Sequence, residues 1–169
     1  KLRAARAAFM PSIISSTCRC GCWGASPEMT TMEMTADAGV RAWIAAWQDG
    51  WRRHDPAVIA ARYAEDCRFR SEPFRRLEHG RAAPLAYAAK SFDEERSATY
   101  TFGEPIVADD GRAAVEYRAV ITAPDGSATT IHGVSVLRIG PDGLVAEHRD
   151  TWTDRDGDHG IDLDKEDAR

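Results

Sequence analysis

The sequence lacks the features that mark several common classes of protein. No apolar run approaches the roughly 18 residues that a membrane-spanning helix requires. Its 22 basic residues are outnumbered by 27 acidic ones, which gives a formal net charge of −5. A chain of this charge has no general attraction for the phosphates of a nucleic acid. We therefore expect neither a membrane nor a nucleic acid as a partner.

Cysteine is scarce and unevenly placed. Three of the four cysteines lie together as Cys18, Cys20 and Cys22, whereas Cys67 stands alone. Because this distribution is not a framework of paired cysteines, the core has to be stable without disulfides. A cytoplasmic location is the corresponding expectation.

The sequence patterns that suggest a bound metal are incomplete. The cluster Cys18–Cys22 has no second group of ligands at zinc-finger spacing. Asp154, Asp156 and Asp158 are similar to the start of a calcium loop, but the glycine comes one place late, at Gly160. We predict no metal site and no cofactor.

The length of 169 residues suits one compact domain. Residues 1–35 contain no acidic residue before Glu28 and show no sustained periodicity, so we predict a disordered N-terminal extension there. Periodic patterns run from 36 to 154, which we predict to be the folded domain. The remaining residues, 155–169, are acidic, and we expect a flexible tail.

The first part of the predicted domain has the spacing of three helices. An apolar face with three tryptophans repeats at helical intervals over residues 40–51. Asp55 can cap a second helix whose first residue is Pro56, and we expect this helix to continue through Tyr63. A third apolar stripe, from Leu85 to Phe92, predicts another helix.

The second part has the pattern of strands. Residues 67–71 alternate, and four later segments are rich in β-branched and aromatic residues, near 97–108, 112–122, 128–139 and 144–153. Short turn sequences that contain Asp-Gly separate these four segments, which favours an antiparallel meander. We predict an α+β fold in which three N-terminal helices pack in the concave face of a curved antiparallel sheet.

Several stretches of the sequence are similar to those of a known superfamily. They are the tryptophan-rich first helix, HDPAVIAARYAEDCRF, the Gly80-Arg81 start of the third helix and GVSVLRIGPDGLVAEHRDTW. Over residues 36–154 the chain resembles the nuclear transport factor 2-like superfamily, and within it the SnoaL-like branch of small cone-shaped pocket proteins. The resemblance implies the fold but no single activity, because members range from ketosteroid isomerases, polyketide cyclases and epoxide hydrolases to non-enzymatic binders.

The catalytic pattern of the ketosteroid isomerases is absent. Their tyrosine, aspartate and protonated aspartate correspond here to Trp47, to Ser71 or Glu72, and to Ser135. Trp47 has no phenol, and Ser135 is not a carboxylic acid. This chain therefore does not carry that triad.

The pattern of the limonene-epoxide hydrolases is similar without being reproduced. HRDTW places Asp150 at the position of one of their aspartates, and an earlier strand carries Glu116 and Arg118 in reversed order. The register implied by the resemblance turns both of these side chains inward. Simple alternation instead puts the more apolar set, which includes Val115 and Tyr117, on the inner face. We favour the inward orientation of Glu116 and Arg118.

The candidate catalytic residues are Asp150, Glu116, Arg118 and His148. Their ionisable groups would perturb one another if they met in an aromatic-walled cavity. Asp150 would then be the general base, with His148 as a second base or as the group that orients it, and Arg118 would hold the carboxylates or an oxyanion. The alternative is an internal salt-bridge network without catalysis.

The other candidates would form the walls of the pocket. Aromatic side chains suit this role, although each can equally be part of a plain core, and a serine can hydrogen-bond a ligand. The candidate ligand-binding residues are Trp47, Tyr63, Phe69, Ser71, Phe74, Ser135 and Trp152, with Trp43, Tyr87 and Phe92 as further aromatic candidates.

Three classes of function are compatible with these observations. The first is a cofactor-independent hydrolase, isomerase or cyclase that acts on a mostly apolar metabolite with Asp150 as its base. The second is a non-catalytic protein that binds a small ligand, and the third is a structural dimer module of the same fold. The resemblance also implies a homodimer through the outer face of the sheet, to which we expect Tyr117 and Val134 to contribute.

Overall fold

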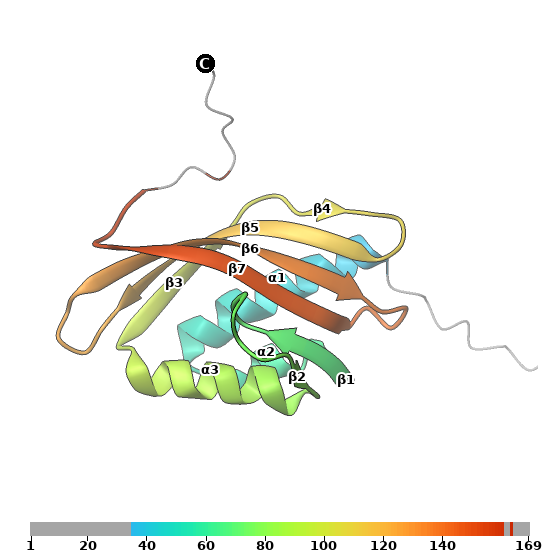
Figure 1. Ribbon diagram of the computed structural model, residues 1–169, viewed down its shortest axis with the longest axis horizontal. Coiled ribbons are helices and arrows are strands. Elements are labelled where there is room, and N and C mark those ends of the chain that lie inside the picture. Colours follow the sequence, from blue (N-terminus) through green and yellow to red (C-terminus); the bar gives the residue numbers. More distant parts are fainter. Residues whose placement is uncertain (1–34, 161–162, 164–169) are drawn as a thin grey trace, which may run out of the picture. The chain divides into compact units, whose positions relative to one another are not determined.

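The computed structural model describes residues 35–160 and residue 163. In this part of the chain the helices are α1 (Ala36–Arg53), α2 (Pro56–Ala60) and α3 (Ala82–Glu94) (Figure 1). The strands are β1 (Tyr63–Arg70), β2 (Glu78–His79), β3 (Ser97–Phe102), β4 (Ile106–Val107), β5 (Arg112–Thr122), β6 (Ala128–Ile139) and β7 (Val145–Asp156). The predicted α+β class is confirmed. The predictions for residues 1–34, including the cysteine cluster, lie outside the described residues.

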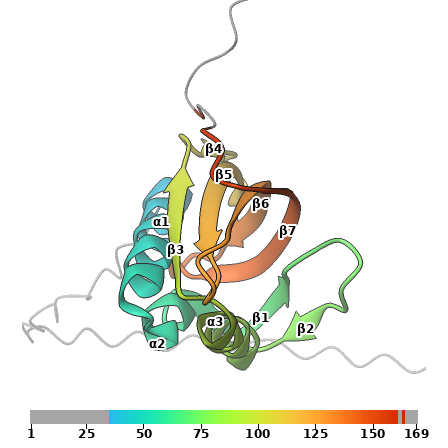
Figure 2. The ribbon, with the colours of Figure 1, turned by 90° about the vertical axis from the view of Figure 1, so that its left-hand side faces the viewer.

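The strands form one curved sheet in the order β2-β1-β7-β6-β5-β3, and β4 pairs with β5. All pairs are antiparallel except β1 and β7, which run parallel. The sheet is therefore mixed, whereas we predicted an antiparallel one. The parallel pair is possible because β1 is not joined to β7 by a hairpin and can take either direction beside it. Figure 2 shows the three helices on the same side of the sheet.

The first two helices begin where the sequence predicts. The Thr35 side chain accepts a hydrogen bond from the backbone N–H of Ala38, and Asp55 caps α2, with Pro56 at its first position. The end of α2 differs from the prediction, because the helix stops at Ala60 and Tyr63 begins β1. Tertiary contacts of the Tyr63 side chain, described below, outweigh the local pattern here. No helix within residues 35–160 is long and apolar enough to cross a membrane.

The turns of the meander follow the sequence closely. Gly111, Gly126 and Gly143 have positive φ angles of 83°, 88° and 72°, as Asp-Gly turns require. Strands β5 and β6 have the predicted bounds. Strand β7 continues to Asp156, three residues beyond the predicted segment. The folded domain thus extends past residue 154, into the segment that we predicted as a tail.

A β-bulge at the start of β7 sets which side chains face the helices. Val145 pairs with Ile139, but Glu147 pairs with Arg138, so Ala146 is an extra residue on this strand. An extra residue shifts the alternation of side chains by one. As a result Val145 and His148 are both fully buried although they are three residues apart.

The three tryptophans of α1 form the centre of the core. Trp43, Trp47 and Trp51 are all buried, and the rings of Trp47 and Trp51 stack with their centroids 4.7 Å apart. Trp43 and Trp47 both meet the His148 ring edge-on. Large rings at helical spacing on one face of α1 therefore hold this helix against the inner face of the sheet.

Close packing between α1 and α2 depends on Gly50. A Cβ atom at this position would overlap the side chain of Ile59 on α2. We expect Gly50→Ala to lower the free energy of unfolding by roughly 1–3 kcal/mol, because the overlap outweighs the better helix propensity of alanine. Urea unfolding followed by tryptophan fluorescence measures this difference. Ala45→Gly, at an exposed position of α1, measures the effect of helix propensity alone, a loss of about 1 kcal/mol. A Gly50→Ala variant more stable than the wild type would refute the packing argument.

Candidate active site

A chain of hydrogen bonds links the first helix to the last strand through Tyr63. The Tyr63 hydroxyl accepts from the indole Nε1 of Trp43 at 2.9 Å and from that of Trp47 at 3.1 Å. The same oxygen lies 2.7 Å from Nδ1 of His148. All four side chains are buried, so water does not compete for these contacts.

These contacts fix the position of the protons. A tyrosine hydroxyl has one O–H group and two lone pairs, and an indole N–H can only donate. The two tryptophans occupy both lone pairs of Tyr63, so Tyr63 donates its own proton to His148 Nδ1. This nitrogen is therefore unprotonated. The imidazole of His148 is neutral and carries its proton on Nε2.

His148 and Ser135 together hold one oxygen of Asp150. His148 Nε2 donates to Asp150 Oδ1 at 2.7 Å, and Ser135 Oγ donates to the same atom at 2.6 Å. An ionised carboxylate can accept both of these hydrogen bonds on one oxygen. The other oxygen, Oδ2, has no hydrogen-bond partner among the described residues. Asp150 thus has one fixed oxygen and one that is available.

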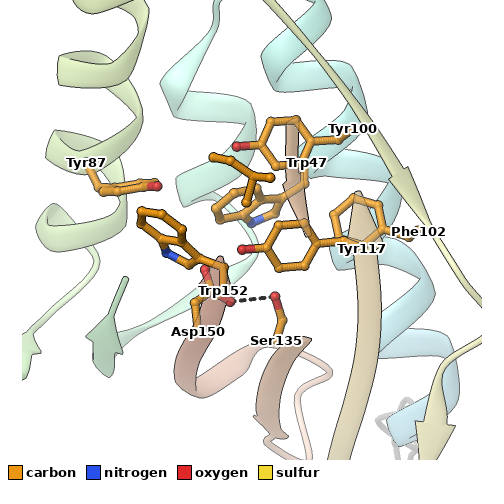
Figure 3. A pocket seen from close by; sticks show the side chains of 9 residues that line it. Trp47, Tyr87, Tyr100, Phe102, Tyr117, Ser135, Asp150 and Trp152 are labelled. Carbon is orange, nitrogen blue, oxygen red and sulfur yellow. Dashed lines mark hydrogen bonds between the residues drawn. The ribbon is translucent and has the colours of Figure 1, made fainter. Parts of the chain in front are cut away.

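Asp150 borders a small hollow between the sheet, α1 and α3 (Figure 3). Six aromatic rings make up most of its wall, and its volume is about 10 Å³. That is close to the smallest space that holds one water molecule, so any larger occupant requires side chains to move. The lining residues are Trp47, Tyr87, Tyr100, Phe102, Tyr117, Ile131, Ser135, Asp150 and Trp152.

Three tyrosine hydroxyls point into this hollow, those of Tyr87, Tyr100 and Tyr117 (Figure 3). Burial raises the pKa of each phenol above its ordinary value, and the negative charge of Asp150 adds to this effect. All three therefore remain protonated at neutral pH and can donate hydrogen bonds. The hollow thus combines one proton acceptor, the Asp150 carboxylate, with three proton donors.

A glycine makes room for two of the rings. Gly133 on β6 pairs with Tyr117 on β5 and with Trp152 on β7. A Cβ atom at this position would lie 2.7 Å from Cβ of Trp152 and 2.9 Å from Cζ of Tyr117. Such distances are too short for real contacts, so only glycine lets both rings flank the hollow.

The predicted inward orientation of Glu116 and Arg118 is wrong. Glu116 lies on the outer face, where Oε1 is 2.6 Å from Nε2 of His132. Arg118 is also on the outer face and binds the backbone oxygen of His159 and the carboxylate of Asp158. The pairing explains this outcome, because directly paired residues share a face and Ser135 pairs with Val115 rather than with Glu116. The acid–arginine–acid pattern is therefore not assembled.

The predicted wall residues have mixed outcomes. Trp47, Ser135 and Trp152 line the hollow. Tyr63, Phe69 and Ser71 are buried outside its lining, although the backbone oxygen of Ser71 accepts a hydrogen bond from Trp152 Nε1 at 2.8 Å. Phe74 is fully exposed in the segment between β1 and β2, so its placement in the wall was wrong.

Sequence reasoning missed Tyr100, Phe102 and Tyr117 as lining residues. The signal was present, because Tyr100 and Phe102 alternate on β3 and Tyr117 belongs to the apolar set of β5. Tyr117 is buried, so its predicted place on an outer dimer face was wrong. Val134 does lie on the outer face and is 38% exposed. The homodimer itself stays a prediction.

The described residues contain no group of three or more histidine, cysteine, aspartate or glutamate side chains arranged to hold a metal ion.

The family model described as the SnoaL-like domain matches residues 40–148. This chain belongs to the SnoaL-like family. The match covers most of the elements that build the hollow, from α1 to His148 on β7. Comparison with curated proteins gives no significant match.

Solved structures share the fold of this SnoaL-like domain. The epoxide hydrolase/cyclase-like enzyme SalBIII of salinomycin pyran ring formation is 21% identical, with a TM-score of 0.57 over 67% of this chain and 89% of that chain. An LEH-like epoxide hydrolase from M. tuberculosis is 11% identical, with a TM-score of 0.58 over 70% of this chain and 84% of that one. An NTF2-like protein of unknown function from Burkholderia pseudomallei is 19% identical, with a TM-score of 0.58 over 71% and 92%. At these identities the likeness shows the fold alone.

A second buried acid lies beside this SnoaL-like site without facing the hollow. Glu95, at the end of α3, has a side-chain oxygen with no hydrogen-bond partner among the described residues, and the same holds for Trp51 Nε1. Burial raises the pKa of Glu95 to about 7, an effect that the nearby Trp51 indole partly offsets. The folded protein therefore keeps this carboxyl protonated at pH values where the unfolded chain would lose the proton.

Removing the Tyr63 hydroxyl tests the hydrogen-bond chain. Tyr63→Phe leaves two buried indole N–H groups and His148 Nδ1 without a partner, so we expect the free energy of unfolding to fall by roughly 2–5 kcal/mol. Tyr87→Phe is the control, because no hydrogen bond of the Tyr87 hydroxyl with another described residue is present, and it should change the stability by less than about 1 kcal/mol. Equal losses in both variants, measured by urea unfolding, would contradict the network.

Glu95 makes the stability depend on pH in a defined direction. Because its pKa is raised by folding, its favourable contribution is complete below pH ~4.5 and is lost as the pH rises through about 7. We expect Glu95→Gln to stabilise the protein at pH 8 by roughly 1–3 kcal/mol and to have little effect at pH 5. The exposed Glu78→Gln is the control. The measurement is urea unfolding at both pH values. If Glu95→Gln changed the free energy of unfolding equally at pH 5 and pH 8, the raised pKa would be ruled out.

Proposed function

We propose that this protein is a cofactor-independent enzyme that transfers a proton within a small organic molecule, or from a water molecule that attacks it. Asp150 is the general base. The observation that carries the proposal is the buried chain from Tyr63 through His148 to Asp150, which ends at a carboxylate oxygen bordering the hollow. Fold alone does not provide this argument, because the same fold hosts many functions.

The hydrogen bonds to Asp150 suit a base. Ser135 and the Nε2–H of His148 fix Oδ1, and this holds the plane of the carboxylate so that Oδ2 meets the bound molecule. Tyr63 donates a hydrogen bond to Nδ1 of His148. The imidazole ring would lose this bond if it flipped, or if it accepted the proton at Nδ1 in place of Asp150. A base held in one orientation, beside an imidazole held in one tautomer, needs little reorganisation during the reaction.

The tyrosines supply the complementary donors. When a base removes a proton next to a carbonyl group, or when water opens a strained ring, negative charge develops on an oxygen of the substrate. Tyr87, Tyr100 and Tyr117 border the same hollow and remain protonated, so they can stabilise such an oxygen by donating hydrogen bonds. This combination favours hydrolase, isomerase or cyclase chemistry on a mostly apolar metabolite.

Two of the similar structures support this class of chemistry by their descriptions, which name an epoxide hydrolase/cyclase-like enzyme and an LEH-like epoxide hydrolase. In the present chain Glu116 and Arg118 lie on the outer face, so any ring opening here would use the tyrosine hydroxyls rather than an arginine. The small volume of the hollow, about 10 Å³, supports the second candidate function, a non-catalytic binding protein whose pocket opens only with its ligand.

The substitution Asp150→Asn tests the proposal. We expect it to slow turnover by roughly 10²–10⁴-fold, because the amide cannot accept the proton. The fold should persist, because the amide oxygen can still accept from His148 and Ser135. Asp154→Asn, the same chemical change at an exposed position on β7, is the matched control and should keep the wild-type rate.

Suitable probes are limonene oxide and cyclohexene oxide, with diol formation as the readout, and cyclic β,γ-unsaturated ketones in D2O, with deuterium uptake and isomerisation as the readout. Wild-type protein should accelerate at least one of these reactions over buffer. Equal rates for Asp150→Asn and the wild type would refute Asp150 as the base. No acceleration of any probe would count against an enzyme and favour the binding protein.

A further inference from the structure

We propose that the hollow takes a ligand with a small quaternary cationic centre, of the tetraalkylammonium class. The observation behind this inference is a buried carboxylate, enclosed by aromatic rings, whose charge no basic side chain of the described residues balances. The inference concerns the same hollow as the proposed function. It rests on that function only in taking Asp150 as a residue that contacts the ligand.

The charge of Asp150 is isolated. Its side chain is 5% exposed, and His148 is the one basic residue of the described chain within salt-bridge distance of it. The contacts of Tyr63 keep His148 neutral, because its Nδ1 accepts the hydroxyl proton. Arg118, which could have balanced the charge, lies on the outer face and pairs with Asp158. A buried anion without a counter-charge is costly, and a bound cation would remove that cost.

The wall of the hollow has the surface that attracts organic cations. Trp47, Phe102 and Trp152 line it, and the faces of such rings carry negative potential, whereas the three tyrosines point their hydroxyls into it. This attraction strengthens when water is excluded, and a space of about 10 Å³ has room for no more than about one water molecule. Aromatic faces and a carboxylate therefore act on a positive charge in the same direction.

The cation should carry alkyl groups rather than N–H groups. A primary ammonium would donate a hydrogen bond to Oδ2 of Asp150 and engage the oxygen that the proposed reaction needs. A quaternary centre has no hydrogen to donate, so it is held by charge and by the rings while Oδ2 remains able to take a proton. Its methyl groups also fit an apolar wall, which makes burial favourable.

The tyrosine hydroxyls provide the opposing tendency. Their O–H groups would attract an anion if they acted alone. Each of the three, however, lies in the field of Asp150, which raises the pKa of Tyr87, Tyr100 and Tyr117 after the larger effect of burial. An anion would meet that same field and be repelled by it. The carboxylate therefore decides the sign of the preferred charge.

Three probes of one shape and different charge test the inference. They are choline, its neutral carbon analogue 3,3-dimethyl-1-butanol, and 3,3-dimethylbutanoate. Binding is measured by the change in tryptophan fluorescence, to which Trp47 and Trp152 in the wall contribute, and by the rise in melting temperature, since a ligand of the folded state stabilises it. We expect choline to bind at least roughly tenfold more tightly than the neutral analogue, and the anion to bind weakest.

Two variants assign the effect to the site. Asp150→Asn should bring the affinity for choline down to that for the neutral analogue, whereas Asp154→Asn should preserve the difference. Phe102→Leu, which removes one ring without touching a hydrogen bond, should reduce the preference for choline by several-fold. Tetramethylammonium as a second cation should follow choline in every variant.

Equal binding of choline and the alcohol, tighter binding of the anion, no binding of any probe at 100 mM, or an unchanged preference in Asp150→Asn would each overturn the inference. The epoxide and ketone assays in the same variants separate this result from the proposed function. If turnover depends on Asp150 but binding shows no preference for cations, Asp150 stays the proposed base and the cationic ligand is refuted. A preference for cations without turnover leaves the binding site and removes the catalytic base.

Discussion

The hydroxyl of Tyr63 is the constraint on which the site depends. It receives two indole N–H groups from α1 and has one proton left to give, so the direction of every later hydrogen bond follows from it. His148 must accept at Nδ1 and donate from Nε2, and Asp150 must accept. A charged imidazole would place a second proton between His148 and an oxygen that has no free lone pair. The hydrogen bonds of the core thus select one tautomer of His148.

Two irregular features of the sheet shape the site. The bulge at Ala146 shifts the alternation of β7 so that His148 and Asp150 face the helices together with Val145. Gly133 leaves the space that Tyr117 and Trp152 fill from either side. The hydrogen-bond chain from Tyr63 to Asp150 and the aromatic rings of the hollow therefore meet at the carboxylate of Asp150.

Much of the fold could be predicted from the sequence, and less of the site. The tryptophan spacing of α1, the Asp55-Pro56 start of α2 and the Asp-Gly turns are local signals, and each predicted the observed structure. Tyr63 was misplaced because its hydroxyl contacts residues 16, 20 and 85 positions away, which no local pattern records. Glu116 and Arg118 were misplaced because a register taken from the resemblance replaced the alternation of Val115 and Tyr117. A one-residue shift in register exchanges the two faces of a strand.

The parallel pairing of β1 with β7 has a consequence for how the protein is made. Strand β1 is synthesised early, yet its long partner is the last strand of the sheet, and Tyr63 meets His148 only after 85 residues of chain have followed it. Such pairing raises the contact order and delays the loop closure that the final structure needs. While the polypeptide is still emerging from the ribosome, the helices and the β5–β6 hairpin can assemble. The Tyr63 hydroxyl, however, cannot yet donate its hydrogen bond to His148. Docking of β7 is therefore the step that completes the site.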